Sequence, residues 1–247
     1  MNLKNYPQKN NGMYVLRNQD FETIGEMVLG EYMPGNLVRP QPTSIDSLIY
    51  DCLNLEITSK YISRDGALLG MIAFEDLEWE VFAGGGAEKQ VIPAGTIVID
   101  ASLSGLEQRP RCRFTKAHEA SHWILHRAFH SPERRVYNFR TTQACVACRQ
   151  DKIERLHWNY GEERSDEDWE EWQADSLAAA LLMPYGVFFD AASSVIRNHG
   201  IHYGYLVKGE RIAESIEIIK EIAEIFDVSM RAAQIRMCHM GLIRKWQ

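Results

Sequence analysis

The pentapeptide HEASH at residues 118–122 constrains this chain more than any other short segment. Residues four apart lie on the same face of an α-helix, so the imidazoles of His118 and His122 can reach one metal ion while Glu119 projects beside them. Apolar and small residues recur at helical spacing through residues 114–129. The sequence therefore predicts a helix that packs into a hydrophobic core and presents two metal ligands.

A catalytic zinc site needs three protein ligands and one open position for water, so a third ligand must come from elsewhere in the chain. Metzincin peptidases continue the pattern as HExxHxxGxxH, but Leu125 and Ala128 occupy the glycine and histidine positions here. Gluzincins instead take a glutamate from a later helix, with an aspartate one turn further on. Glu171 and Asp175 fit that spacing. We expect Glu171 to bind the metal and Asp175 to accept a hydrogen bond from His118.

The acidic residues around Glu171 have a simpler interpretation as well. The segment 162–171 is dense in carboxylates, and such runs usually form a solvated face. The same helix, however, continues with small and apolar residues over 177–183 and ends at Pro184, a composition that suits close packing. Carboxylates directed inward at the start of a buried helix are consistent with a bound cation.

The spacing of apolar residues predicts both helices and strands. Helices are expected at 20–32, 44–53, 114–130, 167–183, 185–198, 210–226 and 229–240. Strands are expected at 55–62, 68–74, 79–82 and 96–99. The predicted fold class is α+β, with a small antiparallel sheet packed on a zincin-like helical core and a C-terminal helical segment.

The chain is predicted to have three regions. Residues 1–19 are polar and form a flexible N-terminal arm. Residues 20–209 form a zincin-like metallopeptidase domain, in which 131–165 are a loop or insertion. Residues 210–247 form a C-terminal helical segment packed on that domain.

Composition limits the partners and the compartment. The chain has 27 Lys and Arg residues against 34 Asp and Glu residues, a formal net charge of −7. This balance argues against a broad surface for nucleic acid, so direct DNA binding is not expected. The sequence shows no secretory signal and no apolar run of membrane-spanning length. Because five scattered cysteines also suit a reducing compartment, we expect a cytoplasmic protein without membrane association.

Further cysteines and histidines lie near the metal pattern. Cys145 and Cys148 could supply half of a structural zinc site with His157, but the simpler interpretation is two free thiols in a loop. His126 and His130 continue the four-residue spacing of the pentapeptide. A helix rises about 6 Å over four residues, so we expect these two histidines on the surface or in packing roles.

Three separated segments resemble the ImmA/IrrE family of zinc metallo-endopeptidases. They are RFTKAHEASH at 113–122, EWQADSLAAALLMP at 171–184, and the helical segment at 226–243. Their order matches that of the family, and the resemblance extends over about residues 40–245. Family members usually have glycine before the second histidine, where this chain has Ser121, and the segment between the two metal-bearing helices is longer here.

The resemblance implies a zinc-dependent endopeptidase. His118, His122 and Glu171 would hold the zinc ion, and Glu119 would take the proton of the activated water and pass it to the leaving amine. The expected reaction is limited proteolysis of a helix-turn-helix transcriptional repressor, in the regulation of a mobile element or of a stress response. Residues after the second metal helix are candidate donors to the oxyanion: His199, His202, Tyr203 and Tyr205.

The alternative is a regulatory module, in which zinc is structural and the terminal helices contact DNA or a partner protein. Residues 218–243 have a helix-turn-helix outline, but the second helix offers only Arg231 and Arg236 as cations, so a helical cap over the protease is preferred. The coordination sphere separates the two functions. Three protein ligands and a water favour an enzyme, whereas four protein ligands favour a structural site.

Overall fold

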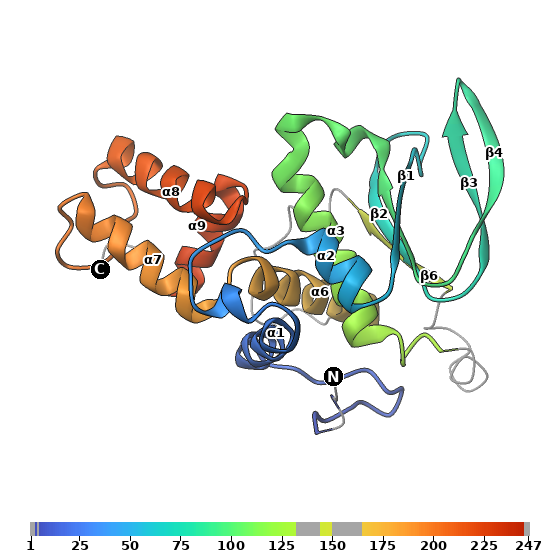
Figure 1. Cartoon of the computed structure of the whole chain (residues 1–247), viewed down its shortest axis with the longest axis horizontal. Helices are drawn as coiled ribbons and strands as arrows, with labels where there is room; N and C mark the ends of the chain where they lie inside the picture. Colours follow the sequence, from blue (N-terminus) through green and yellow to red (C-terminus); the bar gives the residue numbers. More distant parts are fainter. Residues whose placement is uncertain (1–2, 4, 132–143, 150–164, 245–247) are drawn as a thin grey trace. The chain divides into compact units, whose positions relative to one another are not determined.

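The computed structural model describes residue 3 and residues 5–131, 144–149 and 165–244. It contains α-helices together with small β-sheets, so the predicted α+β class is confirmed (Figure 1). The chain forms two compact units, one from residues 1–21 with 45–178 and the other from residues 22–44 with 179–247. The domain boundaries that we predicted after residues 19 and 209 stay predictions.

The described helices occur where the sequence predicts them. They are α1 (Asn18–Tyr32), α2 (Ile45–Ser47) with a π-helical turn at Leu48–Cys52, α3 (Arg109–His126), α6 (Asp166–Leu182), α7 (Tyr185–Asn198), α8 (Ile212–Phe226) and α9 (Met230–His239). Short 3-10 turns lie at Pro34–Leu37, Ala101–Ser104 and Leu106–Gln108. No single described helix has the length and apolarity to cross a membrane, although α6 and α7 taken together as a bent pair do by length and composition.

The main sheet belongs to the first unit. Its strands, in spatial order, are β1 (Glu56–Lys60), β5 (Thr96–Asp100), β2 (Leu68–Ala73) and β6 (Cys145–Arg149). β2 is antiparallel to both of its neighbours, but β1 and β5 are parallel, so the sheet is mixed rather than purely antiparallel. After β1 the chain forms β2, which runs in the opposite direction to β5, and then a hairpin. The chain thereby comes back to the end of the sheet at which β1 begins, so β5 can run parallel to β1.

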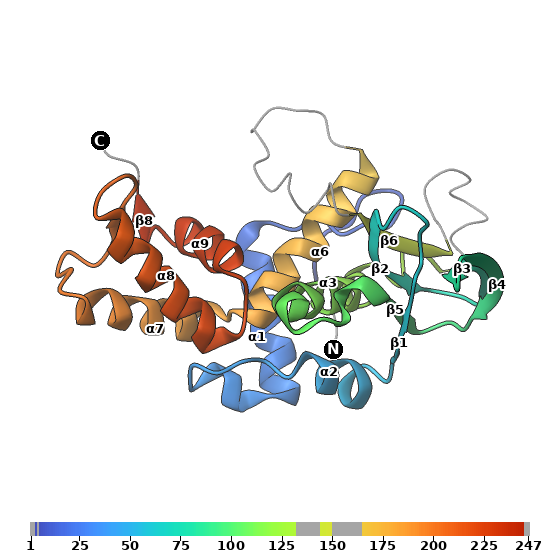
Figure 2. The ribbon, with the colours of Figure 1, turned by 90° about the horizontal axis from the view of Figure 1, so that it is seen from above.

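β6 lies within the segment 131–165, which we predicted to be a loop or insertion. It lies beside β2 (Figure 2) and pairs with it in antiparallel register, with Val146 opposite Ile72 and Cys148 opposite Gly70. The sequence CVACR contains one β-branched residue and thus has only a weak strand signal. The prediction failed because pairing with β2, rather than local propensity, forms this strand.

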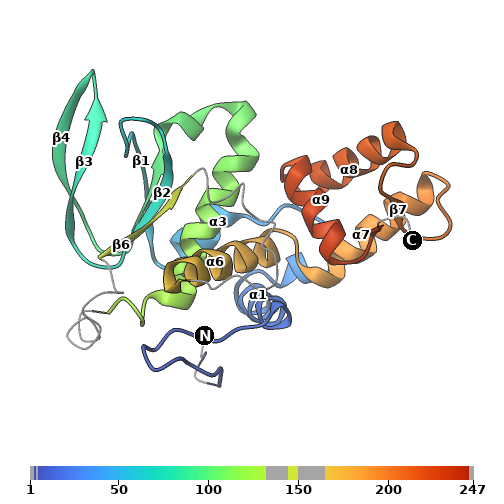
Figure 3. The ribbon, with the colours of Figure 1, turned by 180° about the vertical axis from the view of Figure 1, so that it is seen from behind.

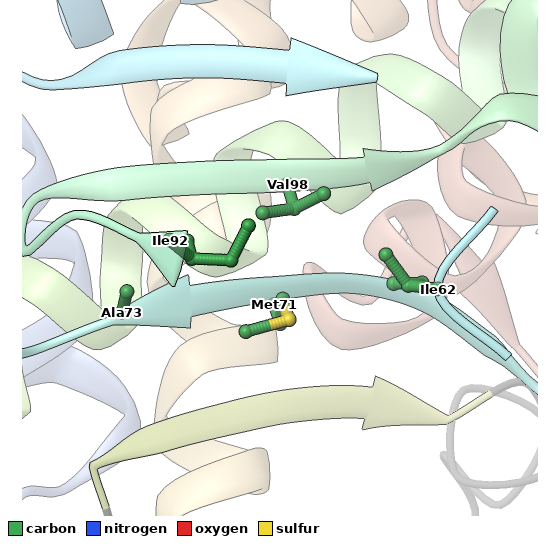
Figure 4. Close-up of a cluster of buried hydrophobic side chains, with 5 residues drawn as sticks. All are labelled: Ile62, Met71, Ala73, Ile92 and Val98. Atoms are coloured by element: carbon green, nitrogen blue, oxygen red, sulfur yellow. The ribbon is translucent and has the colours of Figure 1, made fainter. Parts of the chain in front are cut away.

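A hairpin of β3 (Leu77–Ala83) and β4 (Gly86–Ile92) packs beside the sheet. The two strands join at Gly84-Gly85, where both residues have positive φ, as a tight hairpin turn requires. β4 was not predicted because Gly, Ala, Glu and Lys favour strands weakly. Ile92 brings the hairpin onto a buried cluster that also contains the following residues (Figure 4): Ile62, Met71, Ala73 and Val98.

The helix α3 packs closely on the opposite face of β2 because Gly70 has no side chain. A Cβ atom at Gly70 would lie 2.6 Å from Cγ2 of Thr115 and 3.0 Å from Oε1 of Glu119. The glycine therefore allows the helix that carries the HEASH pentapeptide to approach the sheet.

Substitution of Gly70 with alanine tests this packing. We expect Gly70→Ala to lower the free energy of unfolding by about 1–3 kcal/mol, as overpacking of a close-packed core usually does. Thr115→Ser removes the opposing methyl group and keeps the hydroxyl, which donates to the carbonyl of Arg111. In urea titrations the double variant should recover part of the loss. Strictly additive effects of the two substitutions would contradict a steric origin.

The N-terminal residues contact α6. Lys9 and Asn11 bind the two carboxylate oxygens of Asp166 at 2.8 Å each. Further along the helix, the side-chain amide of Gln173 donates to the backbone carbonyl of Tyr14 at 2.8 Å. Part of the segment that we predicted to be a flexible arm is therefore hydrogen-bonded to the helix that carries Glu171.

The second unit contains α7, α8 and α9. Phe188 of α7 and Phe226 of α8 are fully buried, with ring centroids 5.0 Å apart. Asp227 ends α8 in the left-handed conformation, and Ser229 begins α9 by accepting a hydrogen bond from the backbone of Ala232. Two short strands, β7 (Leu206–Val207) and β8 (Ile243–Arg244), pair in parallel.

Arg236 of α9 is an internal structural residue. Its guanidinium binds both carboxylate oxygens of Glu22, at 2.5 and 2.7 Å, and donates to the backbone carbonyl of Met183. Only 5% of Arg236 is exposed. One of the two cations that a helix-turn-helix interpretation requires is therefore used inside the second unit.

Loss of this guanidinium should destabilise the second unit strongly. Arg236→Leu leaves the Glu22 carboxylate and the Met183 carbonyl without their donor, and breaking a buried ion pair costs about 3–5 kcal/mol. We expect a loss of unfolding free energy at the lower end of this range because the Glu22 side chain is 24% exposed to solvent. Arg231→Leu, at an exposed position of the same helix, should change unfolding by less than about 0.5 kcal/mol. Equal effects in chemical denaturation would contradict this role.

Candidate metal centre

The helices α3 and α6 lie close together (Figure 3), and within the first unit their side chains bring together the three predicted metal ligands. His118 and His122 lie one turn apart on α3 and are fully buried, and Glu171 of α6 is 6% exposed. The Nε2 atoms of the two histidines are 2.9 Å apart, and the Glu171 carboxylate oxygens lie 3.5 Å from that of His118 and 3.7 Å from that of His122. These residues form a group that could hold a metal ion.

The hydrogen bond between His118 and Asp175 orients the first imidazole. Nδ1 of His118 lies 2.8 Å from Oδ1 of Asp175. A carboxylate accepts, so this nitrogen donates its proton and Nε2 faces Glu171 and His122 with its lone pair. The predicted role of Asp175 as an acceptor for His118 thus agrees with the geometry.

A longer chain of hydrogen bonds orients His122. Because Gln173 donates to Tyr14 through its amide nitrogen, its Oε1 atom is the acceptor that faces Nε2 of His126, at 3.0 Å. His126 therefore donates from Nε2 and accepts at Nδ1, which lies 3.1 Å from Nδ1 of His122. His122 in turn donates from Nδ1 and presents the lone pair of Nε2 to His118.

Two nitrogen lone pairs only 2.9 Å apart require a cation between them, either a proton or a metal ion. Burial lowers the pKa of His118, but Cys148, Asp175 and Glu171 outweigh burial and raise this pKa well above its usual value. The pocket therefore favours positive charge at this position. Zinc binds imidazole nitrogen at about 2.0–2.1 Å and carboxylate oxygen at about 2.0–2.2 Å, and two histidines with one glutamate are a familiar donor set, so these residues fit a metal ion.

Glu119 lies beside this group and is fully buried. Neither of its carboxylate oxygens has a hydrogen-bond partner of normal geometry among the described residues. Burial raises the pKa of this carboxyl group to about 8, while the charge of His118 acts in the opposite direction. A buried carboxylate without a partner is costly, and such groups are typical of catalytic positions.

Cys148 is a further member of the site, and the sequence did not predict it. It is fully buried on β6, and one donor atom each of Cys148, His118 and Glu119 lie within 4.8 Å of one another. Burial raises the pKa of this thiol to about 11. The alternation of side chains along a strand is the signal that could have separated Cys148 from Cys145.

Cys145 points away from the metal ligands. Cys145 and Ala147 pack on the hydrophobic cluster under the hairpin, whereas Cys148 faces α3. Residues three apart on a strand lie on opposite faces, so the two cysteines cannot bind the same ion. Neither cysteine forms a disulfide, as the interpretation of two free thiols in a loop expected, but its loop was wrong because both cysteines lie on β6. His157, the third residue of the structural zinc site that we considered, lies outside the described residues.

His126 and His130 have defined polar partners. Both are buried, at 0% and 1% exposure, so of the two positions that we expected for them the packed interior is confirmed and the surface is not. Nε2 of His130 lies 2.5 Å from Oε1 of Glu170, and Nδ1 of His126 lies 3.9 Å from the same oxygen. His122, His126 and Glu170 form a second group with metal-binding geometry, which competes with the first for the imidazole of His122.

The four candidate oxyanion donors belong to the second unit. Nε2 of His199 lies 3.1 Å from a carboxylate oxygen of Glu221. The rings of Tyr203 and Tyr205 are in edge contact, with centroids 5.0 Å apart, and His202 is exposed. Their assignment to the oxyanion stays a prediction.

Comparison with known proteins adds no assignment. The chain matches no family model and no curated protein. The class that the fold and site define is therefore an α+β protein with a buried group of two histidines and one glutamate that could hold a metal ion.

Proposed function

We propose that this protein is a zinc-dependent endopeptidase. The observation that carries the proposal is the buried Glu119 carboxylate beside His118, His122 and Glu171, for which the described residues offer no hydrogen-bond partner of normal geometry. A structural metal site has no use for an unpaired carboxylate, whereas hydrolysis needs a base next to the metal. The resemblance to ImmA/IrrE peptidases supports the same assignment.

The residues of the proposed site have two roles, metal binding and orientation of the imidazoles. His118, His122 and Glu171 hold the metal, and Asp175 and His126 keep the two imidazoles in the tautomers that expose Nε2. Zinc bound there would lower the pKa of a water molecule to about 7 and polarise the scissile carbonyl.

Glu119 is the proposed general base and acid. Its carboxylate accepts a proton from the attacking water and delivers it to the amine that leaves. The buried environment favours the protonated form, since burial raises the pKa of this group, so the proton can be retained until the C–N bond breaks.

The proposed substrate is a helix-turn-helix transcriptional repressor, which is cut in regulation of a mobile element or of a stress response. This part of the proposal comes from the resemblance alone. Direct DNA binding is not part of it, because the formal net charge is −7 and Arg236 is bound to Glu22. The cytoplasm is the compartment in which such a substrate would be met.

A regulatory module with a structural metal site is the second candidate function. Cys148 favours it, because the thiol lies at the site and zinc with four protein ligands is usually structural. The two functions differ in whether the metal supports turnover.

Chelation of the metal tests the proposed function. The protein would be co-expressed with helix-turn-helix repressors encoded beside its gene, and cleavage would be followed by mass spectrometry. We expect one repressor to be cut at a single site, cleavage to stop with chelator, and activity to return with zinc. Cleavage that persists after the metal has been removed would exclude the mechanism, and an absence of cleavage with stoichiometric zinc bound would favour the structural site.

A further inference from the structure

The four-residue spacing of histidines on α3 continues for one more turn beyond the metal ligands, to His126. On α6, Glu170 immediately precedes Glu171, and consecutive residues of a helix point about 100° apart. Each glutamate therefore meets a different pair of histidines. The result is two groups with the same donor set, first His118, His122 and Glu171, and then His122, His126 and Glu170.

The two groups use different nitrogens of the imidazole that they share. Nε2 of His122 lies 2.9 Å from Nε2 of His118. Nδ1 of the same ring lies 3.1 Å from Nδ1 of His126. An ion in the first group therefore leaves a nitrogen of His122 for an ion in the second group.

The second group is about as compact as the first. Two nitrogens bound to one tetrahedral zinc ion at about 2.0–2.1 Å lie about 3.3–3.4 Å apart, and the 3.1 Å between His122 and His126 is close to that separation. Oε1 of Glu170 lies 3.9 Å from Nδ1 of His126, and the donor atoms of the three residues all lie within 4.8 Å of one another. Small movements of the side chains would complete the coordination of an ion.

The surroundings prepare these donors for a cation. His122 and His126 are fully buried, and Glu170 is 5% exposed. Burial lowers the pKa of His126, so its ring is neutral and Nδ1 keeps the lone pair that a metal ion needs. The hydrogen bond from His130 holds the Glu170 carboxylate in place, as partners of metal ligands commonly do.

We propose that His122, His126 and Glu170 bind a second zinc ion, and that the imidazole of His122 bridges it to the first. The second ion replaces the proton on Nδ1 of His122, which passes to solvent. Glu170, Glu171 and the deprotonated ring then supply three negative charges to two divalent cations. An ion on Nε2 draws electrons from the ring and eases this replacement, so the second ion binds after the first. Its binding requires the metal site proposed above but no peptidase activity.

The zinc content of the chain tests the second site. The full-length metal-free protein would be equilibrated with increasing free zinc, and bound zinc would be measured by elemental mass spectrometry. We expect two ions in the unmodified chain, the second at higher free zinc, and one ion in Glu170→Gln, because an amide is a poor zinc ligand. Glu167→Gln is the matched control, since it removes an exposed carboxylate from the same helix, and it should bind two ions. One ion in the unmodified chain, or two in Glu170→Gln, overturns the proposal.

Substitution of Glu171 tests the bridge. Because the second ion follows the first, Glu171→Gln should bind neither ion over the same range of zinc, whereas Glu170→Gln should lose only one. Independent sites would leave one ion in each variant and would overturn the bridge. Thermal unfolding of the unmodified protein needs no variant: its midpoint should rise in two steps as zinc increases, and a single step overturns the second site.

Cleavage separates the second site from the proposed function. Two bound ions without cleavage of any repressor would refute the peptidase and support the second site. Zinc-dependent cleavage by a protein that never binds more than one ion would support the peptidase and refute the second site.

Discussion

Glu119→Gln is expected to abolish cleavage and leave zinc bound. The carboxylate is not among the three ligands, and glutamine has nearly the same shape, so the metal site should be preserved. General acid–base catalysis contributes about 10²–10⁴-fold to the rate, and the variant should lose at least this factor. Zinc content by mass spectrometry and single-turnover cleavage are the two measurements required.

The thermal stability of Glu119→Gln distinguishes a loss of catalysis from misfolding. Glu119 is buried and burial raises the pKa of its carboxyl group to about 8, so a neutral amide should be tolerated and the thermal midpoint should not fall. Glu170→Gln is a suitable control, since this glutamate is also buried but binds His130 and does not belong to the group of His118, His122 and Glu171. Normal cleavage by Glu119→Gln would refute its role as the base.

Substitution of Glu171 should have the second large effect. Glu171→Gln removes the only carboxylate of the three-residue group. We expect zinc affinity to fall by more than 10–100-fold, the loss that is typical when a residue hydrogen-bonded to a metal ligand is substituted. Because bound zinc stabilises the folded state by about 4.1 kcal/mol at a concentration 1,000 times Kd, the stabilisation by added zinc should also be lost. Equilibrium dialysis and thermal unfolding with and without zinc measure the two effects.

The same experiment decides between the two buried metal groups. If the metal binds His118, His122 and Glu171, Glu170→Gln should keep most of its zinc affinity. If it binds His122, His126 and Glu170 instead, the two substitutions should exchange their effects. The second outcome would contradict the ligand assignment.

Local periodicity was sufficient to predict the helices and the pairing of the metal ligands. The spacing of His118 and His122 depends only on the pitch of a helix, and the distance between Glu171 and Asp175 depends on the same pitch. The choice of Glu171 also needed the apolar residues that follow it, which indicated a buried helix. These features are encoded within short segments, so a single sequence reveals them.

Contacts between distant segments were not predictable in this way. Cys148 reaches the site only through its register with Gly70, and neither residue carries a local signal of that pairing. His126 is a hydrogen-bond partner of His122 only because Gln173 and Tyr14 fix its tautomer from other parts of the chain. Such long-range relationships require the fold, and they explain why β6 and the hydrogen-bond partners of His126 were not predicted.

The hydrogen bond from Gln173 to the carbonyl of Tyr14 links the beginning of the chain to the tautomer of the His122 imidazole. Trimming the chain beyond Tyr14 would free the Gln173 amide to rotate, and His126 could then change its tautomer. His122 would lose the acceptor that holds the proton on its Nδ1 atom. Removal of residues 1–14 would in this way change the metal affinity of residues more than a hundred positions away.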